Sequence, residues 1–186
     1  MSRSTSESPS IERREFACEW EEAFARLKPS LLGALFLLLD GDETASRDAF
    51  ETLRASFAAV ERAADASTAR TALFRALYLE ATRRRATASV ETQPRSDDAN
   101  DESGSEIEEA RRAILSLSFD ERSAFLLRQN GELTLEQTAA ATDRTTQETK
   151  SLLSAAVKKL SRALANASER RRAQTQLMEE TATQDA

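Results

Sequence analysis

Residues 117–164, LSFDERSAFLLRQNGELTLEQTAAATDRTTQETKSLLSAAVKKLSRAL, decide the fold of this chain. The stretch contains three capping boxes, which begin at Ser118, Thr134 and Thr145. In a capping box a Ser or Thr side chain accepts a hydrogen bond from a backbone N–H three residues later, where a Glu or Gln bonds back to the cap. Each box predicts the start of a helix, so three consecutive helices are expected here.

The second and third of these helices are separated by a very short turn. We expect a short helix over Thr134–Ala141, a turn over Thr142–Thr145 and a longer helix over Thr146–Leu164. This order predicts a helix-turn-helix, whose second helix can lie in the major groove of DNA. An ordinary helical hairpin with a solvated outer face fits the same pattern. The stripe of the longer helix that is expected to face inward comprises Thr149, Leu152, Leu153, Ala156, Leu160, Ala163 and Leu164.

Polar and basic residues occupy the opposite side of the longer helix and the turn before it. In a helix-turn-helix, the N-terminal half of the second helix presents its side chains to base edges, while nearby cations hold phosphates. A solvated helix face is the alternative for the cations. The candidate DNA-binding residues are Arg144, Thr145, Thr146, Gln147, Lys150, Ser151, Ser154, Lys158, Lys159 and Arg162.

Composition divides the chain into segments. Residues 1–10 are rich in Ser and lack large apolar side chains, which predicts a disordered N-terminus. Residues 86–105 lose nearly all apolar content and predict a flexible, acidic-polar linker. Helical periodicity runs through residues 11–85 and again through 106–172, and residues 173–186 form a tail. The sequence therefore predicts an all-α fold, with two small helical domains joined by a flexible linker.

Within the first unit, four helices are expected. The first begins at Ile11, and Pro29 fits the first turn of the second, because proline is well tolerated at a helix start. Asp40-Gly41-Asp42 marks a turn, and a third helix is expected over Thr44–Ala64. The fourth is expected to end near Arg85.

The composition also excludes several classes of function. The 186 residues carry a net charge of −6, with no His and a single Cys, so the usual His-based catalysis and His–Cys metal sites are excluded. The sequence contains no Gly-rich phosphate loop or nucleophile motif, and we expect neither an enzyme nor a cofactor. The N-terminus has no apolar core of a signal peptide, and the run Leu31–Leu39 is too short to cross a bilayer. We therefore expect a cytoplasmic protein without a membrane partner.

Residues 117–164 resemble region 4 of the extracytoplasmic-function sigma factors of RNA polymerase. The resemblance lies in the spacing of three elements: an L-P-x-x-x-R-x-x-F-x-L-R opening, a G-L-S-x-x-E-I-A stretch and a T-V-K-S recognition helix. The matching residues are Leu117, Arg122, Phe125, Leu127, Arg128, Leu133, Thr134, Glu136, Ala139, Thr149, Lys150, Ser151, Leu153, Ala156, Lys159 and Leu160.

The first unit is similar to sigma region 2, with fewer matching residues. Residues 45–57, ASRDAFETLRASF, resemble the segment by which such factors grip polymerase. The resemblance implies a polymerase-binding site at Arg47, Asp48, Phe50 and Glu51. Residues 69–85, ARTALFRALYLEATRRR, resemble in length and basic end the helix that melts the promoter.

Promoter melting requires an aromatic surface or a pocket for an unpaired base, since stacking on an aromatic ring contributes about 1–3 kcal/mol per base. Phe74 and Tyr78 are the nearby candidates in the first unit, and a core position is the alternative for Phe74. The recognition helix has Leu152, Ser154 and Ala155 where the family often has Arg or His.

The resemblance implies a sigma-factor-like transcription initiation protein. Its expected partners are core RNA polymerase and double-stranded promoter DNA, and the family also implies an anti-sigma factor. The alternative is a degenerate sigma-like interaction module, which binds polymerase or a regulator without reading promoters.

Overall fold

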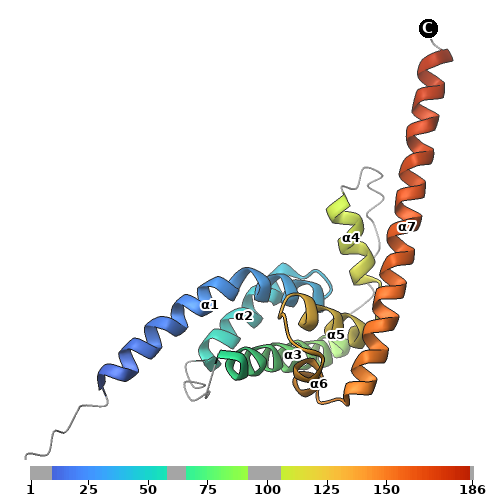
Figure 1. The fold of residues 1–186 in the computed structure, drawn as a ribbon. Helices are drawn as coiled ribbons and strands as arrows, with labels where there is room; N and C mark the ends of the chain where they lie inside the picture. Colours follow the sequence, from blue (N-terminus) through green and yellow to red (C-terminus); the bar gives the residue numbers. More distant parts are fainter. Residues whose placement is uncertain (1–9, 58–65, 92–105, 185–186) are drawn as a thin grey trace, which may run out of the picture.

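The computed structural model describes residues 10–57, 66–91 and 106–184, and these residues form seven helices and no strand (Figure 1). The all-α prediction is confirmed. A central group of helices packs together, while the N-terminal part of the first helix and the C-terminal part of the last extend away from it (Figure 1). The helices are α1 (Ser10–Leu38), α2 (Glu43–Phe57), α3 (Ala66–Glu91), α4 (Glu106–Leu115), α5 (Phe119–Gln129), α6 (Leu135–Thr142) and α7 (Thr146–Gln184).

The expectation of two helices before Asp40 was wrong. Helix α1 continues without a break across Pro29, which lies inside the helix and not in the first turn of a new one. Proline removes one backbone hydrogen bond from a helix interior. The turn that does end α1 contains Asp40 and Gly41, both of which have left-handed backbone angles, with φ of 56° and 81°.

Several other helix ends differ from the predictions. Helix α3 continues to Glu91, past the predicted end near Arg85 and into the predicted linker. Helix α7 continues to Gln184, past the predicted end at Leu164 and through the predicted tail. Two segments lie outside the described residues. Residues 58–65 include the predicted end of the third helix, and residues 92–105 make up most of the predicted linker.

The two predicted units pack against each other. One cluster of buried apolar side chains takes members from both sides of the linker. The first unit contributes Leu35 and Phe74, and the second contributes Leu126, Leu127 and Leu133, each at most 1% exposed. Phe74 is therefore a core residue. Gly131 lies so close to Phe74 that a Cβ there would be 3.1 Å from the ring.

A second, smaller cluster joins the long last helix to the rest of the second unit. It comprises Ala113 and Leu117 from α4 and the following turn, and Ala156 and Leu160 from α7. Leu164 was expected to face inward as well, but it is 43% exposed. Helix α7 still contacts α4 beyond this point, where Arg171 pairs with Glu106 and Glu109 (Figure 1). No described helix is both long and apolar enough to cross a membrane.

Candidate nucleic-acid interface

Three caps fix the geometry of the helix-turn-helix. The side chains of Ser118 and Thr134 accept hydrogen bonds from the backbone N–H groups three residues later, and both boxes are closed by their Glu and Gln partners. At the third box, the Glu148 N–H donates to Thr145 Oγ1 at 3.2 Å and the Thr145 N–H donates to Glu148 Oε2 at 2.8 Å. This second bond is the main cause that lowers the pKa of Glu148. All three predicted capping boxes are confirmed.

The turn between α6 and α7 is as short as predicted. Asp143 caps α6 in the left-handed region with φ of 58°, and its N–H donates to the carbonyl of Ala139. Helix α7 starts three residues later, at Thr146. The left-handed Asp143 redirects the chain directly after α6. Helices α6 and α7 therefore meet as the two helices of a helix-turn-helix, and they pack directly on each other.

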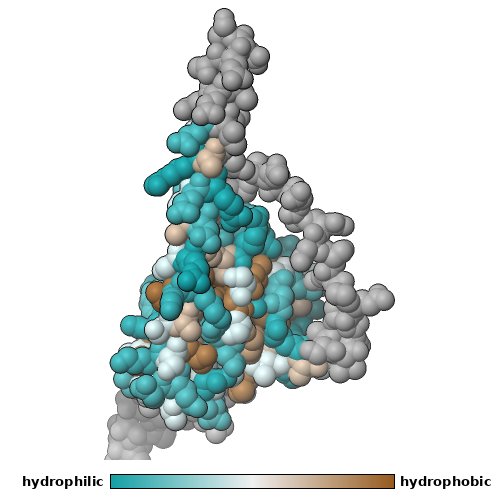
Figure 2. Space-filling view, turned by 90° about the vertical axis from the view of Figure 1, so that its right-hand side faces the viewer, coloured by the Kyte–Doolittle hydropathy of each residue, from teal (hydrophilic) through white to brown (hydrophobic). Residues whose placement is uncertain are grey.

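One face of the first part of α7 is buried and the opposite face is open. Thr149 and Ala156 are fully buried, and Leu152 and Leu153 are half-buried, in agreement with the predicted inner stripe. Figure 2 looks onto the molecule from the side on which α7 lies in Figure 1, and hydrophilic side chains cover much of this helix there. The exposed predicted DNA-binding residues are Thr145, Thr146, Gln147, Lys150, Ser151, Ser154, Lys158, Lys159 and Arg162.

Lys159 differs from the other cations of α7 because it has a partner within the protein. Its Nζ lies 2.7 Å from Oε1 of Glu121, a buried carboxylate on α5. This bond is the main cause that lowers the pKa of Glu121, although burial acts in the opposite direction. Glu121 also closes the first capping box, so Lys159 fixes α7 to the start of α5.

Arg144 is also held by the protein. Its Nη2 lies 2.7 Å from Asp120 Oδ1, and its side chain is 29% exposed. Partial burial acts to lower the pKa of Arg144, but the charge of Asp120 and a hydrogen bond with Tyr78 outweigh this effect and raise it. Tyr78 belongs to α3, so this predicted DNA-binding residue contacts the first unit.

The predicted polymerase-binding residues divide into two groups on α2. Arg47, Asp48 and Glu51 are exposed, and Arg47 pairs with Glu43 on the same helix at 2.6 Å. Phe50 is only 4% exposed, and the centre of its ring lies 5.4 Å from that of Phe24 on α1. Phe50 therefore holds α2 to α1 and does not form part of the open face of α2.

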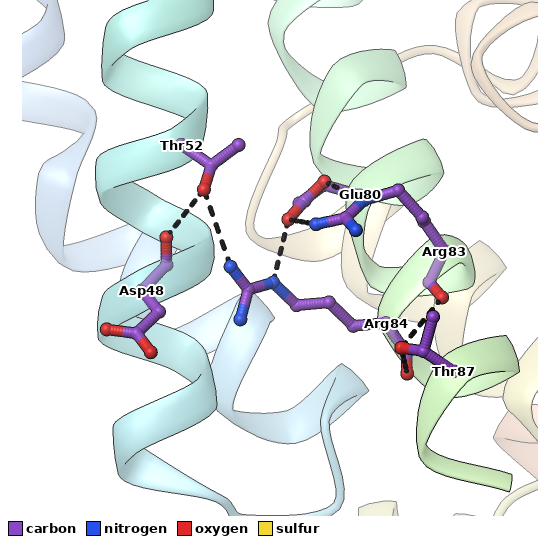
Figure 3. A network of polar contacts seen from close by, with 6 residues as sticks. All are labelled: Asp48, Thr52, Glu80, Arg83, Arg84 and Thr87. Atoms are coloured by element: carbon purple, nitrogen blue, oxygen red, sulfur yellow. Dashed lines mark hydrogen bonds and ion pairs between the residues drawn. The ribbon is translucent and has the colours of Figure 1, made fainter. Parts of the chain in front are cut away.

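A polar network holds α2 beside α3 (Figure 3). Glu80 on α3 accepts hydrogen bonds from Arg83 and Arg84, and its pKa is lowered mainly by the bond from Arg83. Arg84 also donates to the Thr52 hydroxyl of α2, while Thr52 donates to the carbonyl of Asp48. Two of the three consecutive arginines at 83–85 thus form hydrogen bonds with Glu80 within the protein.

The residues that join the two units were not predicted from the sequence. Arg122 on α5, whose side chain is 4% exposed, donates to the carbonyl of Leu37 at 2.6 Å and to Asp40 Oδ1 at 2.8 Å. Asp40 also pairs with Arg85 on α3. Arg122 was part of the family resemblance, but Asp40 was interpreted only as a turn residue, and no local pattern brings the two together.

A known protein family matches the part of the chain that contains the helix-turn-helix. Residues 107–160 match the family described as Sigma-70, region 4. The C-terminal unit is a sigma-70 region 4 domain. The resemblance inferred from residues 117–164 is thus confirmed. No curated protein sequence matches the chain.

The arrangement of both units is similar to that of a solved sigma factor. The structure of the sigma factor RpoE from Bartonella quintana, in complex with the anti-sigma factor NepR, aligns with a TM-score of 0.62 and 18% sequence identity. The alignment covers 79% of this chain and 97% of that chain, so it extends well beyond the region 4 domain. The aligned part of this chain therefore has the fold of that sigma factor.

Proposed function

We propose that this protein is a transcription initiation factor of the sigma type, located in the cytoplasm. It binds duplex promoter DNA through the open face of α7 and core RNA polymerase through the open face of α2. The observation that carries the proposal is the exposure of Gln147, Lys150, Ser151, Ser154 and Lys158 on one face of the second helix of a region 4 domain.

The chemistry of this face suits a DNA duplex. Lys150 and Lys158 are exposed, and no described hydrogen bond or ion pair engages either ammonium group, so both can contact phosphates. Gln147, Ser151 and Ser154 supply short polar side chains for base edges. Lys159 and Arg144 are less suited to this role, because the protein itself engages both.

Lys150 and Lys158 are the first test of this proposal. Replacing both by Ala should weaken binding to every duplex and reduce the slope of log Kobs against log salt by roughly 0.9 for each lost phosphate contact. Fluorescence anisotropy with labelled duplexes over a salt series measures both quantities.

Arg172→Ala is the matched control. Arg172 is exposed on the same helix but lies 26 residues beyond Thr146, about 39 Å along the axis, whereas the major groove is only about 12 Å wide. This variant should bind DNA as the wild type does. If the double variant keeps the wild-type affinity and salt slope, the α7 face is not the DNA site.

A sigma-like interaction module that does not read promoters is the second candidate. The first ten residues of α7, Thr146–Ala155, contain no arginine, and each missing bidentate Arg–guanine contact removes about 1–3 kcal/mol of base discrimination. The Bartonella quintana protein was solved with an anti-sigma factor, and a regulator of that class is a candidate partner for this chain.

Transcription with purified core polymerase separates the two candidates. A promoter-reading factor directs transcripts that start at defined positions on fragments of genomic DNA. The module binds polymerase or the regulator and produces no specific transcript from any fragment.

A further inference from the structure

The end of α3 presents a hydroxyl that closely follows a run of arginines. Arg83, Arg84 and Arg85 are consecutive, and Thr87 comes two residues after Arg85. Thr87 is exposed, and its hydroxyl lies 2.8 Å from the carbonyl oxygen of Arg84, to which it donates, and 3.4 Å from that of Arg83. Both carbonyls belong to the same part of α3, so the hydroxyl of Thr87 is not used to join α3 to another described helix.

Two of these arginines already hold an anion on the same face of α3. The Glu80 carboxylate accepts hydrogen bonds at 2.7 Å from Arg83, three residues later, and from Arg84, four residues later (Figure 3). Side chains three or four residues apart are neighbours on a helix. Thr87 follows Arg83 by four residues and Arg84 by three, so it has the same spacing from this pair as Glu80, on the other side. An anion at Thr87 would therefore lie within reach of the same two guanidinium groups.

Arg83 is the arginine that can change its partner. Its side chain is 59% exposed, whereas that of Glu80 is 9% exposed. Arg84 is more enclosed, and it also donates to the Thr52 hydroxyl on α2. A phosphate suits this position, because a guanidinium group binds it through two parallel hydrogen bonds and its charge exceeds that of a carboxylate. Arg83 can thus turn to a phosphate on Thr87 while Arg84 stays with Glu80.

The place of Thr87 near the end of its helix makes the hydroxyl accessible to an enzyme. Glu91, the last residue of α3, follows Thr87 by about one turn. The terminal turns of a helix open more readily than its middle, because their backbone groups lack part of their hydrogen bonds. A protein kinase binds its acceptor residue in an extended segment and selects substrates by the charges beside that residue. The arginines before Thr87 and the helix end after it provide both features.

Ser161 on α7 shows what the place in the helix contributes. Two lysines precede Ser161 with the same spacing that Arg84 and Arg85 have to Thr87, and Ser161 is also exposed. Ser161 lies well inside α7, however, so a kinase would have to unwind a helix that continues on both sides. The same pattern of positive charge is therefore accessible at Thr87 and blocked at Ser161.

We propose that Thr87 is a phosphorylation site, modified by a protein kinase that recognises the arginines before it, and that the phosphate draws Arg83 away from Glu80. In the transfer, Thr87 Oγ1 bonds to the γ-phosphorus of ATP and the bond from that phosphorus to the β,γ-bridging oxygen breaks. ADP leaves, and the hydroxyl proton passes to a carboxylate of the kinase. The inference goes beyond the proposed function and does not depend on it.

The modification changes the charge of this end of α3. Residues 80–87 contain three Arg and one Glu, which give a net charge of +2. The phosphate adds about two negative charges. A basic helix end thus becomes nearly neutral, and its attraction for other anions is lost.

Phosphorylation of the folded full chain tests the first half of the proposal. A purified kinase domain that selects Arg-Arg-x-Ser/Thr is incubated with the chain and ATP, and site-resolved mass spectrometry follows the phosphate. The control variant, Lys158→Arg with Lys159→Arg, places the same pair of arginines before Ser161. We expect Thr87 to be modified roughly tenfold faster than Ser161 in this variant, and Thr87→Ala to remove the first product. If Thr87 is not modified, or is modified no faster than Ser161, the site is overturned.

A double-mutant cycle tests the second half. Arg83→Gln and Glu80→Gln, alone and together, give the coupling between these side chains from urea unfolding of the full chain. The hydrogen bonds of 2.7 and 2.9 Å predict a favourable coupling before phosphorylation. We expect phosphate on Thr87 to abolish this coupling, whereas that of Arg47 with Glu43, a pair on α2, should persist. An Arg83–Glu80 coupling that survives phosphorylation would overturn the exchange of partners, and far-UV circular dichroism checks that each variant remains helical.

Discussion

At the residue scale, the cations of α7 show how one residue type serves two purposes. Lys158 and Lys159 are neighbours in sequence, but successive residues on a helix point about 100° apart. Lys158 faces outward, whereas Lys159 reaches the buried carboxylate of Glu121. Both lysines were predicted to bind DNA, because the sequence alone does not show that Glu121 lies next to Lys159.

The Glu121–Lys159 pair gives a pH-dependent prediction. The lowered pKa of Glu121 means that folding favours its ionised form, so the pair stabilises the fold above the ordinary carboxyl pKa of 4.5. As pH falls through the lowered pKa, this contribution is lost. Glu121→Gln keeps a capping-box residue but removes the charge, and should reduce the free energy of unfolding at pH 7 by about 1 kcal/mol.

Urea unfolding at pH 7 and at pH 3 measures the effect. The difference between wild type and Glu121→Gln should shrink at the lower pH. Lys159→Met in both backgrounds completes a double-mutant cycle, whose coupling energy should shrink in parallel. A difference that stays constant with pH would show that the lost charge is not the cause.

At the element scale, the sequence predicted helix starts far better than helix ends. The starts of α5, α6 and α7 depend on caps within four residues, and all three were correctly placed. The end of α7 was not, because no Gly or Pro occurs between Leu164 and Gln184 to stop the helix. Pro29 was interpreted as a helix start, but α1 continues across it. The local preference of proline for the first turn of a helix therefore did not decide where this helix begins.

The cap of α6 gives a prediction at this scale. The Thr134 hydroxyl accepts the N–H of Gln137 at 3.2 Å, and Thr134 is exposed, so little packing is lost when it is changed. Thr134→Ala should lower the free energy of unfolding by about 1 kcal/mol, whereas Thr134→Ser, which keeps the accepting oxygen, should lower it much less. Chemical denaturation followed by circular dichroism measures both, and equal losses would rule out capping as the cause.

At the scale of the whole molecule, the sequence predicted the parts and not their association. The loss of apolar residues at 86–105 predicts two helical segments, and the spacing of residues 117–164 identifies the second. The contact between the segments depends on pairs such as Asp40 and Arg122, which are far apart in sequence. Such pairs leave no periodic pattern, so the packing of the second unit on α3 could be found only from the structure.

The shared core makes a last prediction, about cooperativity. Leu127 on α5 is fully buried in the cluster that also contains Leu35 and Phe74 of the first unit. Leu127→Ala should therefore destabilise both units together, by about 2–5 kcal/mol. Hydrogen exchange measured separately for peptides from α3 and α7 should show faster exchange in both by a similar factor. If only α7 responds, the two units unfold independently, and the shared cluster does not couple their stabilities.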